Sequence, residues 1–155
     1  MAGETVERTR TIAAPRDEVW AVIGDVSRMP EWSEELESVD VLAGDGRSVG
    51  SRFRGKNTAD ARSWSMECTI DVYDDGRAFE FHTQNDKGET RTRWWYRLEP
   101  AMDGTLVTEG FMRVAKLGRV RALAEKKLLG DRTEYNTRNI DESLRRLAEL
   151  VESNA

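Results

Sequence analysis

The sequence predicts an α+β fold in which a curved antiparallel sheet wraps around a long C-terminal helix. Three observations favour this fold. Most of the chain alternates apolar and polar residues in short stretches divided by turn residues, as half-buried strands do. The C-terminal segment instead repeats apolar side chains at helical spacing. The length of 155 residues suits one domain, so we expect a single domain over residues 1–155 with one core.

Two short helices are expected after the first strand. Residues 5–13 alternate and are rich in Thr and Val, which predicts a strand. Pro15 suits the first turn of a helix, where a missing N–H costs nothing, and a second helical turn is expected over residues 27–32. Trp20 and Trp32 lie on the apolar side of these segments, so we expect both to anchor the core.

The chain up to Val114 is expected to continue as a meander of strands. Strands over residues 36–42 and 49–57 flank a turn signal at residues 43–46. The next region, residues 62–114, alternates through three further turns. These turns are Asp75-Gly76, residues 85–88 and residues 100–104.

The turn at Asp75-Gly76 predicts a register that polarity can test. A two-residue type I′ turn there places Ile70 opposite Phe81. Val72 is then opposite Phe79 on the same apolar face. This inner face is expected to continue through Trp64, Met66 and Cys68, whereas His82 belongs to the polar outer face.

The later hairpins are expected to extend the inner face. Its further members would be Thr90, Thr92, Trp94, Tyr96 and Leu98, followed by Leu106, Thr108, Gly110 and Met112. The outer face would then carry an apolar patch of Trp95, Val107 and Phe111. Such a patch is either a homodimer interface or is covered by the stems of neighbouring arginines, so the monomer and the homodimer both stay open.

A helical pattern follows Val114 and is interrupted at Gly130. Residues 131–134 resemble a capping box, which predicts a final helix to about Glu152. One stripe of this region holds Leu129, Thr133, Asn136, Ile140, Leu144, Leu147 and Val151. Because buried polar groups need hydrogen-bond partners, Thr133 and Asn136 on this stripe point to water, a protein partner or a ligand.

Composition and residue counts argue against several functions. The net charge of −5 disfavours a nucleic-acid partner, and no apolar run is long enough to span a bilayer. One cysteine and one histidine exclude the usual zinc sites, and no loop has EF-hand spacing, so no metal or cofactor is expected; a carboxylate-only Mg²⁺ or Ca²⁺ site is the alternative that stays open. Cys68 and His82 face opposite sides of the sheet, which argues against a thiol nucleophile and its base. We expect a cytoplasmic protein.

Several segments together resemble one protein family. They are Ala14-Pro15-Arg16-Asp17-Glu18-Val19-Trp20, residues 24–32, Val49-Gly50-Ser51-Arg52-Phe53, Trp94-x-Tyr96-x-Leu98 and Gly104-Thr105-Leu106-Val107-Thr108-Glu109. The chain resembles the START-like, birch-pollen-allergen-like superfamily in its bacterial polyketide cyclase/dehydrase-type branch. The resemblance implies a helix-grip fold, with a seven-stranded sheet and a cavity between the sheet and the last helix. It also implies an apolar ligand, such as a lipid, a polyketide or another aromatic or isoprenoid metabolite, and no shared catalytic motif.

The candidate ligand-binding residues lie on the expected inner face and on the facing helix stripe. They are Phe53, Trp64, Met66, Phe81, Trp94, Tyr96, Thr108, Thr133, Asn136 and Ile140. Each of these is also a plausible core residue. Tyr96 is a weak catalytic candidate as a hydrogen-bond donor to a ligand carbonyl, and the alternative is an internal partner for its hydroxyl. Arg10 is a counter-ion for an acidic ligand or a rim residue.

Three functions remain open. The first is binding or carriage of a small hydrophobic molecule. The second is a polyketide cyclase or dehydratase that holds reacting atoms together. The third is a protein-interaction module with a vestigial cavity, which would act through the outer patch.

Overall fold

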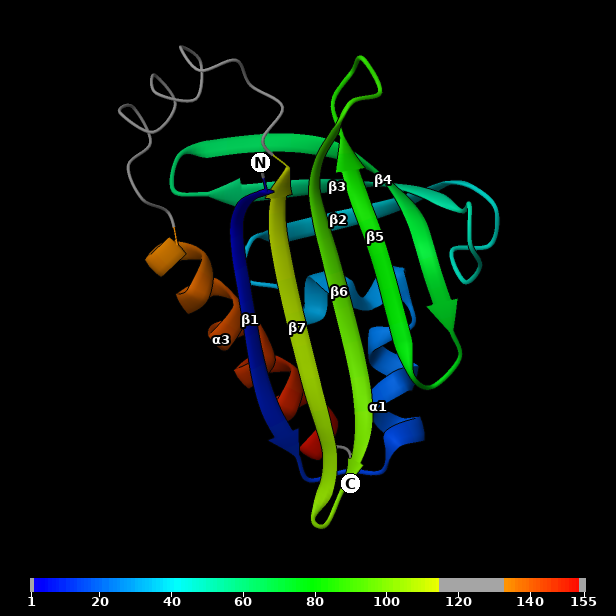
Figure 1. Ribbon diagram of the computed structural model, residues 1–155, viewed down its shortest axis with the longest axis vertical. Coiled ribbons are helices and arrows are strands. Elements are labelled where there is room, and N and C mark those ends of the chain that lie inside the picture. The colour runs from blue at the N-terminus through cyan, green and yellow to red at the C-terminus, as the bar shows by residue number, and fades with distance from the viewer. Residues whose placement is uncertain (1, 115–132, 154–155) are drawn as a thin grey trace.

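A computed structural model describes residues 2–114 and 133–153 of the chain (Figure 1). The elements are β1 (Ala2–Ile12), α1 (Arg16–Ile23), the 3-10 helix η1 (Val26–Glu31), β2 (Leu36–Ala43), β3 (Arg52–Ala59), β4 (Arg62–Asp74), β5 (Ala78–Gln84), β6 (Thr90–Ala101), β7 (Gly104–Val114) and α3 (Thr133–Glu152). The strands form one seven-stranded antiparallel sheet in the order β1-β7-β6-β5-β4-β3-β2. The predicted α+β, helix-grip fold is confirmed.

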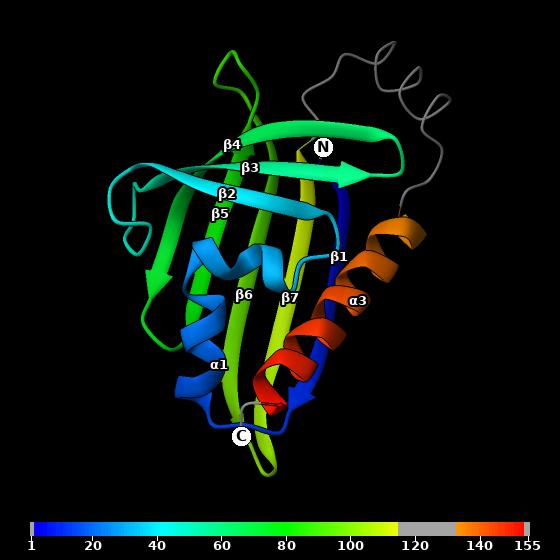
Figure 2. The ribbon, with the colours of Figure 1, turned by 180° about the vertical axis from the view of Figure 1, so that it is seen from behind.

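The helices lie on one side of the sheet (Figure 2). Trp20 and Trp32 expose 8% and 1% of their surface, so both are core residues as predicted. The aliphatic stripe of the last helix is also confirmed. Its buried residues are Ile140, Leu144, Leu147, Ala148 and Val151. The helical pattern after Val114, with Leu129, Gly130 and most of the capping box, lies outside the described residues.

The hairpin between β4 and β5 has one extra residue in its loop and one bulge. Ile70 is opposite Phe81 as predicted, but Tyr73 takes the place expected for Val72 opposite Phe79. A shift in register between Ile70 and Val72 compensates for the longer loop. The bulge turns Tyr73 inward, where its hydroxyl donates to the Gly24 carbonyl at 2.7 Å and stabilises the end of α1.

The predicted facing of β7 is wrong by one residue. Ala101 pairs with Gly104, so the loop holds two residues, and Trp94 lies opposite Phe111. The inner residues of β7 are therefore Thr105, Val107, Glu109 and Phe111, all buried, instead of Leu106, Thr108, Gly110 and Met112. Because Val107 and Phe111 face the core, the expected outer patch is reduced to Trp95. The interaction-module hypothesis loses the surface on which it rested.

On the outer face, the indole of Trp95 covers Gly110, its cross-strand partner. The indole N–H donates to Glu7 on β1 at 2.7 Å. A Cβ atom added at Gly110 would lie 1.9 Å from Cε2 of Trp95. Glycine is needed here because the ring fills the space of a side chain.

We expect Gly110→Ala to lower the free energy of unfolding by about 2 kcal/mol, since the new methyl group forces Trp95 off its site and breaks the Glu7 hydrogen bond. Denaturant titration measures this loss. In a Trp95→Ala background the same substitution should cost almost nothing. An equal cost in both backgrounds would show that the backbone, and not the indole, requires glycine.

Candidate functional site

Six aromatic side chains on the inner face of the sheet form a continuous layer. They are Phe53, Phe79, Phe81, Trp94, Tyr96 and Phe111, called here the aromatic wall. Ring centroids are 5.3 Å apart for Phe53 and Phe81, and 4.8 Å apart for Trp94 and Phe111. Such tilted and edge contacts stabilise aromatic pairs beyond the area that they bury. The wall extends across β3, β5, β6 and β7.

The inner face is closed at one end and open at the other. Phe79 is fully buried, whereas Trp94 is half-buried. Further along the sheet, Met66 is half-buried and Trp64 exposes 37% of its surface. The face therefore offers aromatic and thioether surface towards the start of β4.

A buried polar pair interrupts the apolar face. The Tyr96 hydroxyl donates to Oε2 of Glu109 at 3.0 Å, and the two residues expose 3% and 2% of their surface. Burial raises the pKa of the Glu109 carboxyl to about 8, although the Tyr96 hydrogen bond acts in the opposite direction. Burial and the Glu109 charge raise the pKa of Tyr96 well above its ordinary value. At neutral pH the pair is a phenol beside a largely protonated carboxyl group.

Two buried polar atoms, one in this pair and one beside it, lack hydrogen-bond partners. They are Oε1 of Glu109 and Nε1 of Trp32. The Trp32 ring meets the Tyr96 ring edge-on, with centroids 5.5 Å apart. Buried polar groups are nearly always paired in proteins, so two unpaired atoms around one tyrosine are unusual.

The first turns of α3 are held by carboxylates from two other segments. Asn136 donates to Glu4 of β1 at 2.9 Å. On the other side, Glu35 accepts hydrogen bonds from Tyr135 and Asn139. Glu35 therefore ties α3 to the segment before β2.

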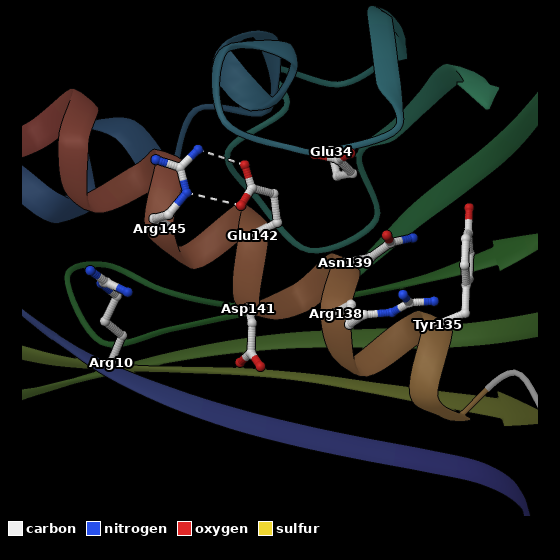
Figure 3. A pocket seen from close by; sticks show the side chains of 8 residues that line it. All are labelled: Arg10, Glu34, Tyr135, Arg138, Asn139, Asp141, Glu142 and Arg145. Atoms are coloured by element: carbon white, nitrogen blue, oxygen red, sulfur yellow. Dashed lines mark hydrogen bonds and ion pairs between the residues drawn. The ribbon is translucent and has the colours of Figure 1, made fainter. Parts of the chain in front are cut away.

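A surface cleft of about 640 Å³ lies beside α3 and is strongly charged (Figure 3). Its lining residues are Arg10, Glu34, Tyr135, Arg138, Asn139, Asp141, Glu142 and Arg145. Arg10 is exposed and lines this cleft, so it does not reach inward as a counter-ion. The mixed charge of this cleft does not suit an apolar molecule.

The structure places the sequence-predicted site residues in three groups. Phe53, Phe81, Trp94 and Tyr96 belong to the aromatic wall, with Met66 and Trp64 beyond its open end. Ile140 is buried in α3, and Asn136 lies near its start. Thr108 is on the outer face, because β7 turns toward the core the residues that were predicted to face outward. Thr133 begins α3, but its side chain lies outside the described part of the structure.

The amino-acid sequence alone did not lead us to Glu109, to the unpaired nitrogen of Trp32 or to the inward facing of Phe111. The signal for Glu109 was the two-residue turn Met102-Asp103, which changes which residues of β7 face inward. Cys68 and His82 do face opposite sides as predicted: Cys68 is buried, whereas His82 bonds Asp71 at 2.8 Å on the outer face. Burial raises the pKa of the Cys68 thiol to about 12, which disfavours a nucleophilic thiolate.

Within the described ranges, no helix is long and apolar enough to cross a membrane.

Comparisons with known proteins agree with this architecture. The family model described as polyketide cyclase / dehydrase and lipid transport matches residues 4–152. A putative polyketide cyclase of Streptomyces cyaneus is 38% identical over 65 residues, which is 42% of either chain. The Zhui aromatase/cyclase from Streptomyces sp. R1128 superposes with a TM-score of 0.72 at 18% identity, over 96% of this chain and 93% of that one. The protein TTHA0849 from Thermus thermophilus superposes with a TM-score of 0.70 at 21% identity, over 98% and 99%. At these identities the structural likeness shows the fold.

Proposed function

The chain belongs to the polyketide cyclase / dehydrase and lipid transport family, and from this premise we propose that it binds a small, largely apolar molecule between the sheet and α3. In this proposal residues 1–155 act as one START-like domain. The ligand is a lipid, a polyketide or another aromatic or isoprenoid metabolite. It contacts the aromatic wall, with Met66 and Trp64 near the entrance and α3 on the opposite side.

The observation that carries the proposal is the aromatic wall with its open end. Each ring left partly exposed forgoes some of the free energy of apolar burial, which a ligand on the wall would recover. Here Trp94 is half-buried and Trp64 exposes 37% of its surface on the inner face. Flat aromatic surfaces of this kind suit stacking against a planar or elongated apolar ligand.

Native mass spectrometry of the purified protein tests this function. We expect a stoichiometric apolar adduct, and we expect Trp94→Ala to weaken its binding about tenfold through lost stacking area. Trp95→Ala is the matched control, since it removes the same ring from the next residue but on the outer face. Its adduct should be retained.

Equal loss of the adduct in the Trp94 and Trp95 variants would contradict the proposed site. It would mean that the molecule binds away from the aromatic wall, or that both variants lose it because they are unstable. A wild-type protein without an adduct, and without a thermal shift across lipids and aromatic polyketides, would overturn binding altogether.

A second candidate function is cyclisation or dehydration of a polyketide, and the Tyr96–Glu109 pair is the observation that favours it. The Glu109 carboxyl group, with a pKa of about 8, can donate or accept a proton near neutral pH, and the Tyr96 hydroxyl holds it in place through a hydrogen bond. The family description and the names of two relatives support the same chemistry for those proteins.

We expect Tyr96→Phe to lower turnover of a linear poly-β-ketone substrate about a hundredfold if the chain is such an enzyme, because Glu109 loses the hydrogen bond that positions it for proton transfer. Chromatographic measurement of the cyclised product checks this. Tyr73→Phe is the control, since its hydroxyl bonds the Gly24 carbonyl and not Glu109. Unchanged turnover in Tyr96→Phe would remove the catalytic role of this tyrosine.

A further inference from the structure

The two unpaired atoms beside Tyr96 need a physical explanation. An unpaired buried carboxyl oxygen or indole N–H costs the free energy of its lost hydration, and proteins rarely tolerate one, let alone two together. Glu109 exposes 2% of its surface and Trp32 exposes 1%, so bulk water does not reach them. Both side chains contact the same tyrosine, one at its hydroxyl and one at its ring.

The neighbours of Glu109 do not neutralise it. On β1, its Cα partner Arg8 directs its guanidinium to Asp141 of α3 at 2.8 Å. On β6, Tyr96 occupies Oε2 and leaves Oε1 free. When the carboxyl group is neutral and carries its proton on Oε1, that O–H can donate a hydrogen bond. Trp32 contributes a second donor, because an indole nitrogen carries a hydrogen and accepts nothing.

We propose that Trp32 and Glu109 form a polar anchor that binds one oxygen atom of the ligand. This inference rests on the proposed binding function and deepens it: the ligand is an apolar molecule with a hydroxyl or keto oxygen at its inner end. Tyr96 positions the carboxyl group through its hydrogen bond, and the aromatic wall contacts the apolar remainder of the ligand.

The anchor selects for ligand chemistry in a defined way. A hydrocarbon that reached it would leave both polar atoms unpaired, whereas an oxygen would pair them. Sites built to hydrogen-bond an oxygen discriminate strongly against analogues that lack it. An ionised carboxylate is a poor fit for the inner end, because it would add a buried charge beside Glu109.

The test compares two probes of nearly equal size, 2-naphthol and 2-methylnaphthalene, by isothermal titration calorimetry at pH 6. We expect the wild-type protein to bind 2-naphthol about tenfold more tightly, the effect of one to two net hydrogen bonds. Trp32→Phe, which keeps an aromatic ring but removes the N–H, should reduce this ratio to near one through weaker binding of 2-naphthol. Glu109→Leu is a second variant with the same expected outcome, and circular dichroism confirms that each variant is folded.

The outcomes separate the anchor from the binding function. Equal affinity for both probes in the wild-type protein would overturn the anchor alone and leave an internal water as the partner of the two atoms. A preference for 2-naphthol that survives in both folded variants would also overturn it. Failure of the wild-type protein to bind either aromatic probe would count against the proposed function and the anchor together.

Discussion

Glu109→Gln should make the protein more stable than the wild type at pH 9, by about 4 kcal/mol, and leave its stability nearly unchanged at pH 5. Glutamine has the shape of a protonated glutamate, and its amide oxygen can still accept the Tyr96 hydrogen bond. It cannot ionise inside the core. Urea titrations of both proteins across this pH range measure the difference.

The sign of this stability difference follows from the direction of the pKa shift of Glu109. The Glu109 carboxyl has a pKa of about 8 in the folded protein against an ordinary value of 4.5, which we take for the unfolded chain. Between these values the folded state binds more protons than the unfolded state, so the free energy of unfolding falls as pH rises. The fall is up to about 1.4 kcal/mol for each pH unit and ends above the folded pKa.

The comparison of variants isolates this one group, because all other titrating groups are the same in both proteins. Glu99→Gln is a suitable control, since Glu99 is exposed on the same hairpin. It should leave the pH dependence as it is in the wild type. A wild-type curve that runs parallel to the Glu109→Gln curve from pH 5 to 9 would show that Glu109 titrates normally, which a buried carboxyl could do only if the core opened to water.

Phe111→Ala should lower the free energy of unfolding by about 3 to 4 kcal/mol, the usual cost of removing a buried phenylalanine ring. Phe111 exposes 3% of its surface and contacts Trp94 at a centroid distance of 4.8 Å. Loss of the ring leaves a cavity in the aromatic wall. Equilibrium denaturation at pH 6, where Glu109 is protonated, measures the effect.

The neighbouring residue provides the contrast. Met112 lies on the outer face and is only half-buried, so Met112→Ala should cost about 1 kcal/mol or less. If the two variants exchanged these magnitudes, β7 would have the opposite facing, and Glu109 would then lie outside the core. This pair of measurements therefore tests the register on which the polar anchor depends.

Local sequence signals were sufficient for most elements. Pro15 marked the start of α1, and alternation identified Phe79, Phe81 and Tyr96 as inner residues. Helical spacing identified Ile140 and Leu144 as the inner side of α3. Each of these signals depends on a residue and its near neighbours along the chain, so the sequence alone contains the information.

The errors arose where one residue changes the facing of a strand. A loop of two residues at Met102-Asp103 turned Thr108 outward and Glu109 inward. In the hairpin of β4 and β5, the effects of a longer loop and a bulge nearly cancelled, so Ile70 kept its predicted partner while Val72 did not. Because side chains alternate along a strand, the face depends on loop lengths and bulges that composition does not specify.

By itself, the sequence determined the order of the elements, the curved sheet with its C-terminal helix, and the aromatic character of the inner face. Only the tertiary structure decided that Glu109 is buried against Tyr96 and that Trp32, directly after η1, meets the same ring. These three residues come from separate segments, and their contact depends on the packing of η1 against the sheet. Burial, and with it the raised pKa of Glu109, is a property of all the surrounding residues and not of the local sequence.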